Sequence, residues 1–319
     1  MTETKRTLPT EAEIHEYAKT LSNWGRWGKD DHLGTLNFIT PQKRARAAAT
    51  VKDGVSVSLS RVLRRGDTGP DIGQNFTHYM TGTGERFVGQ KNNGRVQSTG
   101  DYYGIQFHGT YVTHLDALSH VLYDGHLYNG RSAGMINSHQ GATAGDVEIM
   151  HDGIVGRGVL LDIPKTRNVD WLEPSTPLFV SDLEAAERAC GVRVEEGDIL
   201  LIRKGHWKRR AAVGPWAVNQ QGGLSGLHAS ALPWLHERKV SLLGGDPSND
   251  CTPSGYKDFP LAIHMIGIAI MGMCLLDSAD LEALSAACAE RNRYQFLFTM
   301  APLRVLNGTG SPVNPLAMF

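Results

Sequence analysis

The sequence predicts an α/β protein in which several apolar strands are covered by at least three helices. Residues 55–60 alternate apolar and polar side chains with period two, which indicates a half-buried strand. Residues 158–163 and 198–202 are short apolar runs of the kind that form buried strands. Helix signals separate these runs, so strands and helices are expected to alternate along the second half of the chain.

The N-terminal region begins with two expected short helices. Thr10 precedes the first, and Thr40 precedes the second with Pro41 at its first helical position. Residues 1–50 therefore form an N-terminal arm expected to pack on the body or on a second subunit, and residues 51–319 are expected to be a single domain. Glycines punctuate residues 66–104, which predicts loops and short hairpins there.

The second half supplies the main strands and their covering helices. Ser181 and Glu184 form a capping-box pattern that predicts a helix to Ala189. The remaining expected elements are a helix at 229–237, a strand at 240–245, an apolar run at 266–274, a helix at 281–290 and a strand at 294–305.

The composition argues against several functional classes. The chain has 319 residues, with 32 Lys and Arg against 33 Asp and Glu, so it carries no basic surplus for nucleic acid. The longest apolar stretch, 261–276, is interrupted by His264 and too short to span a bilayer, and the first residues lack the apolar core of a signal peptide. The four cysteines show no CxxC spacing. We therefore expect a cytoplasmic protein with neither nucleic acid nor membrane as a partner.

Thirteen histidines invite a search for a metal or acid–base site, and the segment 106–130 contains four of them, His108, His114, His120 and His126, together with Asp116. If His114 and Asp116 lie on a strand, both side chains point to one face about 6 to 7 Å apart at Cα. His120, four residues after Asp116, would return over the same spot on a following helical turn. His108 reaches the site only if the chain turns at Gly109.

This set of imidazoles and a carboxylate suits one divalent ion, Zn²⁺ or Mn²⁺. Taken singly, each histidine is better explained as a surface or satisfied core residue. His228 follows a glycine-rich stretch and is a second candidate for the pocket, although a helix-capping role explains it equally well. His264 is interpreted as structural. Asp246 and Asp250 follow an apolar strand, where either function or turn chemistry explains them.

The run from Thr113 to His120 resembles the H-x-G-T-H-x-D-x-P-x-H signature of the metal-dependent cyclase superfamily, which includes bacterial kynurenine formamidase and isatin hydrolase. Further segments with the same likeness lie at 27–37, 226–228, 243–250 and 308–315. The resemblance implies a swivelling β/β/α fold with mixed sheets covered by helices, and hydrolysis of an amide or lactone. It also implies that His114 and Asp116 are metal ligands and that His120 is an acid–base or substrate-orienting residue.

Two departures from the family pattern matter. The family's first histidine corresponds to Thr110, so His108 is the candidate third ligand only if two extra residues are absorbed in the turn. A glutamate of two-metal members corresponds to Ser230, so one metal per chain is expected.

We therefore expect a metal-dependent hydrolase that uses metal-activated water on a small cyclic amide, lactone or N-acyl compound. His120 and His228 are the candidate catalytic residues, and His108, His114 and Asp116 the candidate ligands. Trp24, Trp27 and Phe38 favour a ring-bearing substrate or serve to pack the arm. The alternatives are a metal-dependent lyase, dehydratase or cyclase, and a non-catalytic binding protein of the same fold. A homodimer or homotetramer is expected.

Overall fold

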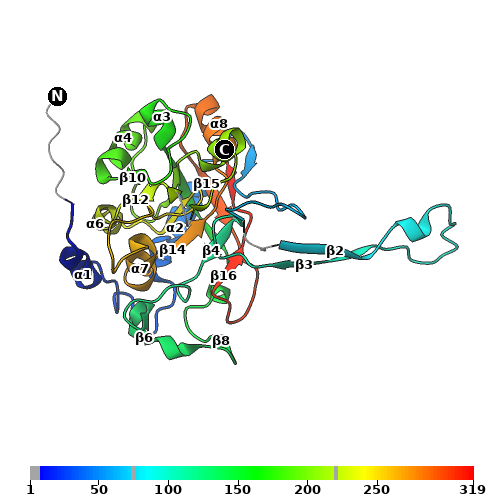
Figure 1. The fold of residues 1–319 in the computed structure, drawn as a ribbon, viewed down its shortest axis with the longest axis horizontal. Coiled ribbons are helices and arrows are strands. Elements are labelled where there is room, and N and C mark those ends of the chain that lie inside the picture. The colour runs from blue at the N-terminus through cyan, green and yellow to red at the C-terminus, as the bar shows by residue number, and fades with distance from the viewer. Residues whose placement is uncertain (1–7, 73–75, 219–221) are drawn as a thin grey trace.

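The computed structural model describes residues 8–72, 76–218 and 222–319. Its fold is mixed α/β, as the sequence predicts (Figure 1). The α-helices of these residues are α1 (Glu11–Thr20), α2 (Pro41–Ala48), α3 (Ile163–Arg167), α4 (Val180–Cys190), α5 (His206–Val213), α6 (Leu232–Glu237), α7 (Ala262–Ala269) and α8 (Glu282–Arg291).

One large mixed sheet organises the described part of the chain. Its nine strands run in the order β1 (Ser56–Ser58), β17 (Leu316–Met318), β15 (Gln295–Met300), β9 (Ile154–Asp162), β11 (Ile199–Arg203), β13 (Leu242–Gly245), β14 (Cys274–Asp277), β4 (His114–Asp116) and β16 (Gly310–Pro312). The central strands β9, β11, β13 and β14 are parallel, and every pairing outside them is antiparallel. Helices α2 and α4 pack against β9, and α7 packs against β14.

Smaller two-stranded sheets surround this core. The longest is the hairpin of β2 (Phe76–Gly82) and β3 (Gly100–Ile105), which projects away from the body (Figure 1). The others pair β5 (His126–Leu127) with β6 (Arg131–Ser132), β7 (Ile136–Asn137) with β8 (Gly141–Ala142), and β10 (Pro177–Leu178) with β12 (Gly226–Leu227). The glycine-rich stretch therefore contains a hairpin, as expected.

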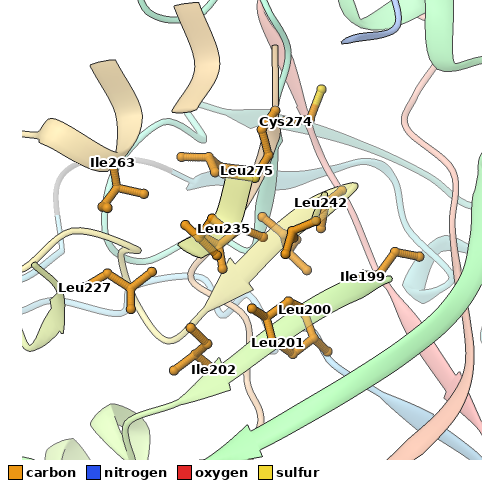
Figure 2. Close-up of a cluster of buried hydrophobic side chains, with 14 of the residues drawn as sticks. Ile199, Leu200, Leu201, Ile202, Leu227, Leu235, Leu242, Ile263, Cys274 and Leu275 are labelled. Atoms are coloured by element: carbon orange, nitrogen blue, oxygen red, sulfur yellow. The ribbon is translucent and has the colours of Figure 1, made fainter. Parts of the chain in front are cut away.

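The core lies where the parallel strands meet the helices. Figure 2 shows side chains of β11, β13 and β14 gathered with Leu235 of α6 and Ile263 of α7. Each strand residue from Ile199 to Ile202 is buried, which explains why 198–202 lacks polar alternation. Burying one such aliphatic side chain contributes about 1.5–3 kcal/mol, so this layer fixes the strand ends that carry the polar site.

Two predicted helix starts are confirmed and one is corrected. Thr10 forms a capping box with Glu13, and the Thr40 side chain accepts from the backbone N–H of Lys43. Helix α4 begins at Val180 instead of after Ser181. The capping carboxylate belongs to Asp182, which accepts from the Phe179 N–H at 2.9 Å, because this carboxylate lies three residues after the true helix cap.

The apolar stretch 261–276 divides into two elements, α7 and then β14. Gly272 lies between them with φ +69°, and a Cβ at that position would lie 2.4 Å from the Tyr128 ring. Only glycine tolerates both conditions, so the helix stops there and the chain enters the sheet. Within the described ranges, no helix combines the length and apolar character that crossing a bilayer requires.

Candidate metal centre

Strand β4 places the first two candidate ligands on one face, as the spacing predicts. It lies between β14 and β16, with His114 opposite both Asp277 and Pro312. The side chains of His114 and Asp116 are buried, and His114 Nε2 lies 3.4 Å from Asp116 Oδ1. The Nδ1 atom of His114 lies 2.7 Å from the Val112 carbonyl oxygen, so Nδ1 donates there and Nε2 faces the carboxylate.

His120 returns to Asp116 through a turn. Its backbone N–H donates to the Ala117 carbonyl at 3.0 Å, and its Nε2 lies 3.7 Å from Asp116 Oδ1. The spacing of Asp116 and His120 predicts a helical turn there, and the structure contains a single tight turn with the same effect.

His108 also reaches Asp116, because the chain turns at Gly109, where φ is +145°. His108 Nδ1 lies 2.9 Å from Asp116 Oδ1, and its Nε2 lies 3.0 Å from Thr309 Oγ1. The rings of His108 and His120 stack at 3.7 Å between centroids. The turn at Gly109, which His108 needs in order to reach the site, is therefore present.

Two further side chains join this cluster from distant parts of the chain. Asp277 ends β14, and its Oδ2 lies 3.2 Å from His264 Nε2. His264, in the first turn of α7, also approaches Asp116 Oδ2 at 3.5 Å. The interpretation of His264 as merely structural is thus incomplete. One sequence pattern could have identified Asp277: it stands at the carboxyl end of an apolar strand, as Asp246 does.

Asp250 fixes the orientation of His264. One Asp250 oxygen accepts from the Ile263 N–H at 2.7 Å, and the other accepts from the His264 N–H at 3.2 Å and from its Nδ1. With Nδ1 held in this way, Nε2 points toward the carboxylates of the cluster. Asp250 is therefore a positioning residue, and the carboxylate also neutralises the positive end of α7.

The electrostatics around Asp116 are unusual for so buried a carboxylate. Burial alone would raise its pKa, but His114 and the other imidazoles hold the pKa of Asp116 well below its usual range. Burial would lower the pKa of His114, yet Asp116 raises it overall. For His120, burial lowers the pKa to about 4, because Asp116 offsets only part of the effect and the neighbouring imidazoles add to it. The His120 ring is therefore neutral at neutral pH.

The donor atoms fit a divalent ion. Among the described residues, His108 Nδ1 and both Asp116 carboxylate oxygens are buried without a hydrogen-bond partner, an arrangement that is costly unless something else satisfies them. Ligands of a tetrahedral zinc ion lie about 3.3–3.6 Å from one another. The separations of 2.9, 3.4 and 3.7 Å that surround Asp116 Oδ1 lie close to this value.

Two overlapping donor sets share Asp116. One combines it with His108 and His120, and the other with His114 and Asp277. In each set the ligand atoms lie within 4.8 Å of one another. Nitrogen and carboxylate donors of this kind suit Zn²⁺ or Mn²⁺.

A cavity of about 1020 Å³ opens onto the cluster. His114, Asp116, His120, His264 and Asp277 line one part of it, and the rest is lined mainly by glycines and by apolar and hydroxyl-bearing side chains, together with Lys257. This volume accommodates a small organic molecule beside the histidines.

His228 lies elsewhere. It caps the short turn Ala229–Ala231, with Nδ1 accepting from the Ser230 N–H at 3.1 Å. Its Nε2 lies 3.2 Å from the Tyr256 hydroxyl oxygen, and burial lowers its pKa. His228 does not line the cavity as described, so its catalytic role stays a prediction. Ser230 bonds to this histidine, 2.9 Å from Oγ to Nδ1.

The other candidates support the fold. Asp246 accepts from the backbone N–H groups of Lys204 and His206 at 2.7 and 2.8 Å. Trp24 donates to the Ala269 carbonyl at 2.8 Å, and Trp27 contacts Phe38 edge-on. Trp24 thus joins the arm to the body, Trp27 and Phe38 pack within the arm, and none of the three lines the described cavity.

The chain belongs to the cyclase family: the family model described as "Putative cyclase" matches residues 45–249. A crystal structure described as a novel cyclase is 30% identical and matches with TM-score 0.85 over 94% of this chain and 100% of its own. Isatin hydrolase A from Labrenzia aggregata, bound to benzyl benzoate, shares the fold at 21% identity and TM-score 0.57, covering 85% of this chain and 95% of its own. An isatin hydrolase bound to the product analogue thioisatinate does so at 18% identity and TM-score 0.56, covering 88% and 99%. No curated protein matches the chain.

Proposed function

We propose that this chain is a metal-dependent hydrolase acting on a small cyclic amide, lactone or N-acyl compound. The observation that carries the proposal is the buried Asp116 carboxylate, which has no hydrogen-bond partner within the described structure and is surrounded by four imidazoles at the edge of a large cavity. The cyclase-family fold, which isatin hydrolases share, supports hydrolysis as the reaction class. Isatin is itself a cyclic amide with a fused ring, which favours a ring-bearing substrate.

In this proposal His108, His114 and Asp116 hold one divalent ion. When bound, the ion supplies Lewis-acid chemistry, polarising a carbonyl oxygen and lowering the pKa of water. Asp277 shares a donor set with His114 and Asp116 and is the candidate donor to a second ion. His264 Nε2 adjoins the carboxylates of Asp116 and Asp277. Metal stoichiometry decides between one and two.

His120 handles the proton. Its Nε2 faces the cluster, and its neutral ring can accept a proton from water as the water oxygen bonds to the substrate carbonyl carbon. The same proton then passes to the leaving nitrogen or oxygen as the carbon–heteroatom bond breaks. Water is consumed, and the product gains a carboxylate whose new oxygen comes from solvent.

The test is metal analysis of the purified protein beside His108→Ala and His114→Ala, with His139→Ala, which alters an exposed loop histidine, as the matched control. We expect about one Zn or Mn per chain in the parent and control, and loss in both cluster variants. About two ions per chain would assign the Asp277 set as well. A parent that takes up neither metal would contradict the proposal.

The reaction class has its own test. Turnover of cyclic amides and lactones in ¹⁸O-labelled water should place one solvent oxygen in the product carboxylate. A product without solvent oxygen would instead favour the lyase or cyclase alternative.

We also propose a homodimer or homotetramer. Exposed aromatic side chains on the β2–β3 hairpin, among them Tyr79, Tyr102 and Tyr103, support self-association. Sedimentation that shows a monomer at micromolar concentration would contradict this part.

A further inference from the structure

Resting on the proposed function, we propose that Lys257 binds an anionic group of the substrate, so that the natural substrate carries a carboxylate apart from its scissile carbonyl. The cavity that contains the histidine cluster also contains Lys257 in its wall. Among the described lining residues it is the only lysine or arginine.

The segment that carries Lys257 is fastened on both sides of it. It runs from Asp250, which caps α7, to the start of α7 itself. The Tyr256 hydroxyl donates to the Pro9 carbonyl at 2.8 Å, and the Asp258 N–H donates to the Glu11 side chain at 2.8 Å. The residues before and after Lys257 are thus tied to the N-terminal arm, which fixes its backbone at the cavity wall.

The Lys257 ammonium has no carboxylate within 4.0 Å in the described part of the chain. The adjacent acid, Asp258, instead approaches His15 Nε2 at 3.6 Å. The carboxylates inside the cavity, Asp116 and Asp277, face imidazoles of the cluster. The charge of Lys257 is therefore available to a ligand.

The rest of the wall defines the body of that ligand. Val121, Val218, Leu224, Pro260 and Leu261 supply apolar surface to the cavity wall. A complementary molecule has an apolar, ring-sized body, a carbonyl at the histidines and a carboxylate near Lys257. The ion pair between the substrate carboxylate and the Lys257 ammonium would then orient the substrate, with its carbonyl toward the histidines.

The test measures binding and requires no turnover. Calorimetry on the metal-loaded protein compares benzoate with benzene-1,3- and benzene-1,4-dicarboxylate. Benzoate and the dicarboxylates each offer one carboxylate to the histidine cluster. The free energy of that contact therefore cancels in the ratio of their dissociation constants. We expect the better dicarboxylate to bind about fivefold more tightly than benzoate, the size of a partly exposed ion pair.

Lys257→Met should reduce this preference to the statistical advantage of two equivalent carboxylates, and Lys257→Arg should retain it. Lys52→Met, at an exposed lysine outside the cavity, is the matched control and should leave it unchanged. Equal preference in the parent and Lys257→Met, or no binding of any probe, would overturn the proposal. The dicarboxylate preference could depend on Lys257 while the protein hydrolyses none of the cyclic amides and lactones. That result would support the anion site and count against the proposed reaction alone.

Discussion

At the scale of single residues, two buried carboxylates end with opposite pKa shifts, because burial raises the pKa of both and only one has enough positive partners to reverse it. Asp116 is surrounded by imidazoles, which hold its pKa low. Asp198 precedes β11 and faces one guanidinium, that of Arg157, at 3.5 Å. Burial raises the pKa of Asp198 to about 6, because Arg157 and the Glu195 N–H only partly offset it.

This difference predicts a pH dependence of stability. The folded pKa of Asp198, about 6, exceeds its ordinary value of 3.8, so its contribution is fully present below pH 3.8 and is lost as pH rises through 6. Relative to Asp198→Asn, the free energy of unfolding of the parent should fall by about 2 kcal/mol between about pH 4.5 and about pH 7.5. Urea unfolding at both pH values measures it.

Asp152→Asn is the control, because that side chain is 95% exposed. A parent-minus-variant difference for Asp198→Asn that stays constant with pH would contradict the assignment.

Part of the candidate site was predictable from the sequence, because four of its residues are close together in the chain. His108, His114, Asp116 and His120 lie in one short segment, where strand periodicity and a turn determine their separation. His264 and Asp277 reach the same carboxylate from α7 and β14. No local pattern relates those segments to β4, so only the tertiary fold reveals their contribution.

At the scale of elements, short apolar strands and helix caps were predictable, because local periodicity and capping chemistry determine them. Strands β16 and β17 were not predicted. Each has only three residues, and β16 contains a glycine and a proline that locally indicate a turn. They are strands because β4, β15 and β1 offer them backbone partners.

The pairing of β9 with β15 predicts a strong effect of one methyl group. Gly158 lies opposite Phe296, and a Cβ at Gly158 would lie 2.2 Å from the Phe296 ring. Gly158→Ala should therefore lower the free energy of unfolding by about 1–3 kcal/mol, because a ring in the core must move.

Chemical denaturation checks this value against Gly84→Ala. A Cβ at Gly84 has as its nearest neighbour a Thr99 methyl carbon at 3.9 Å, so that variant should change stability by less than about 0.5 kcal/mol. Equal stabilities for both variants would show that the core accommodates the methyl group.

At the scale of the whole molecule, the candidate donors link segments that are far apart in sequence. Donors that come together only in the folded chain make metal binding favour folding. At a free metal concentration of about 100 times Kd, the folded state should gain about 2.7 kcal/mol.

Thermal unfolding with zinc and with a chelator measures this gain. The melting temperature should rise with free zinc for the parent and His139→Ala, and much less for His114→Ala. An equal zinc-dependent rise in His114→Ala would place the stabilising ion elsewhere.

The order of strands in the large sheet also bears on how the protein is made. Strand β4 pairs with β14 and β16, and β1 pairs with β17, all of which follow much later in the chain. A ribosome that synthesises the chain from its N-terminus exposes β4 and β1 long before their partners leave the exit tunnel. The edges of β4 therefore stay unpaired during most of translation. Unpaired strand edges are prone to aggregation, so we expect chaperones to bind the nascent chain in this period. Ion capture by the full donor set must follow the emergence of β14.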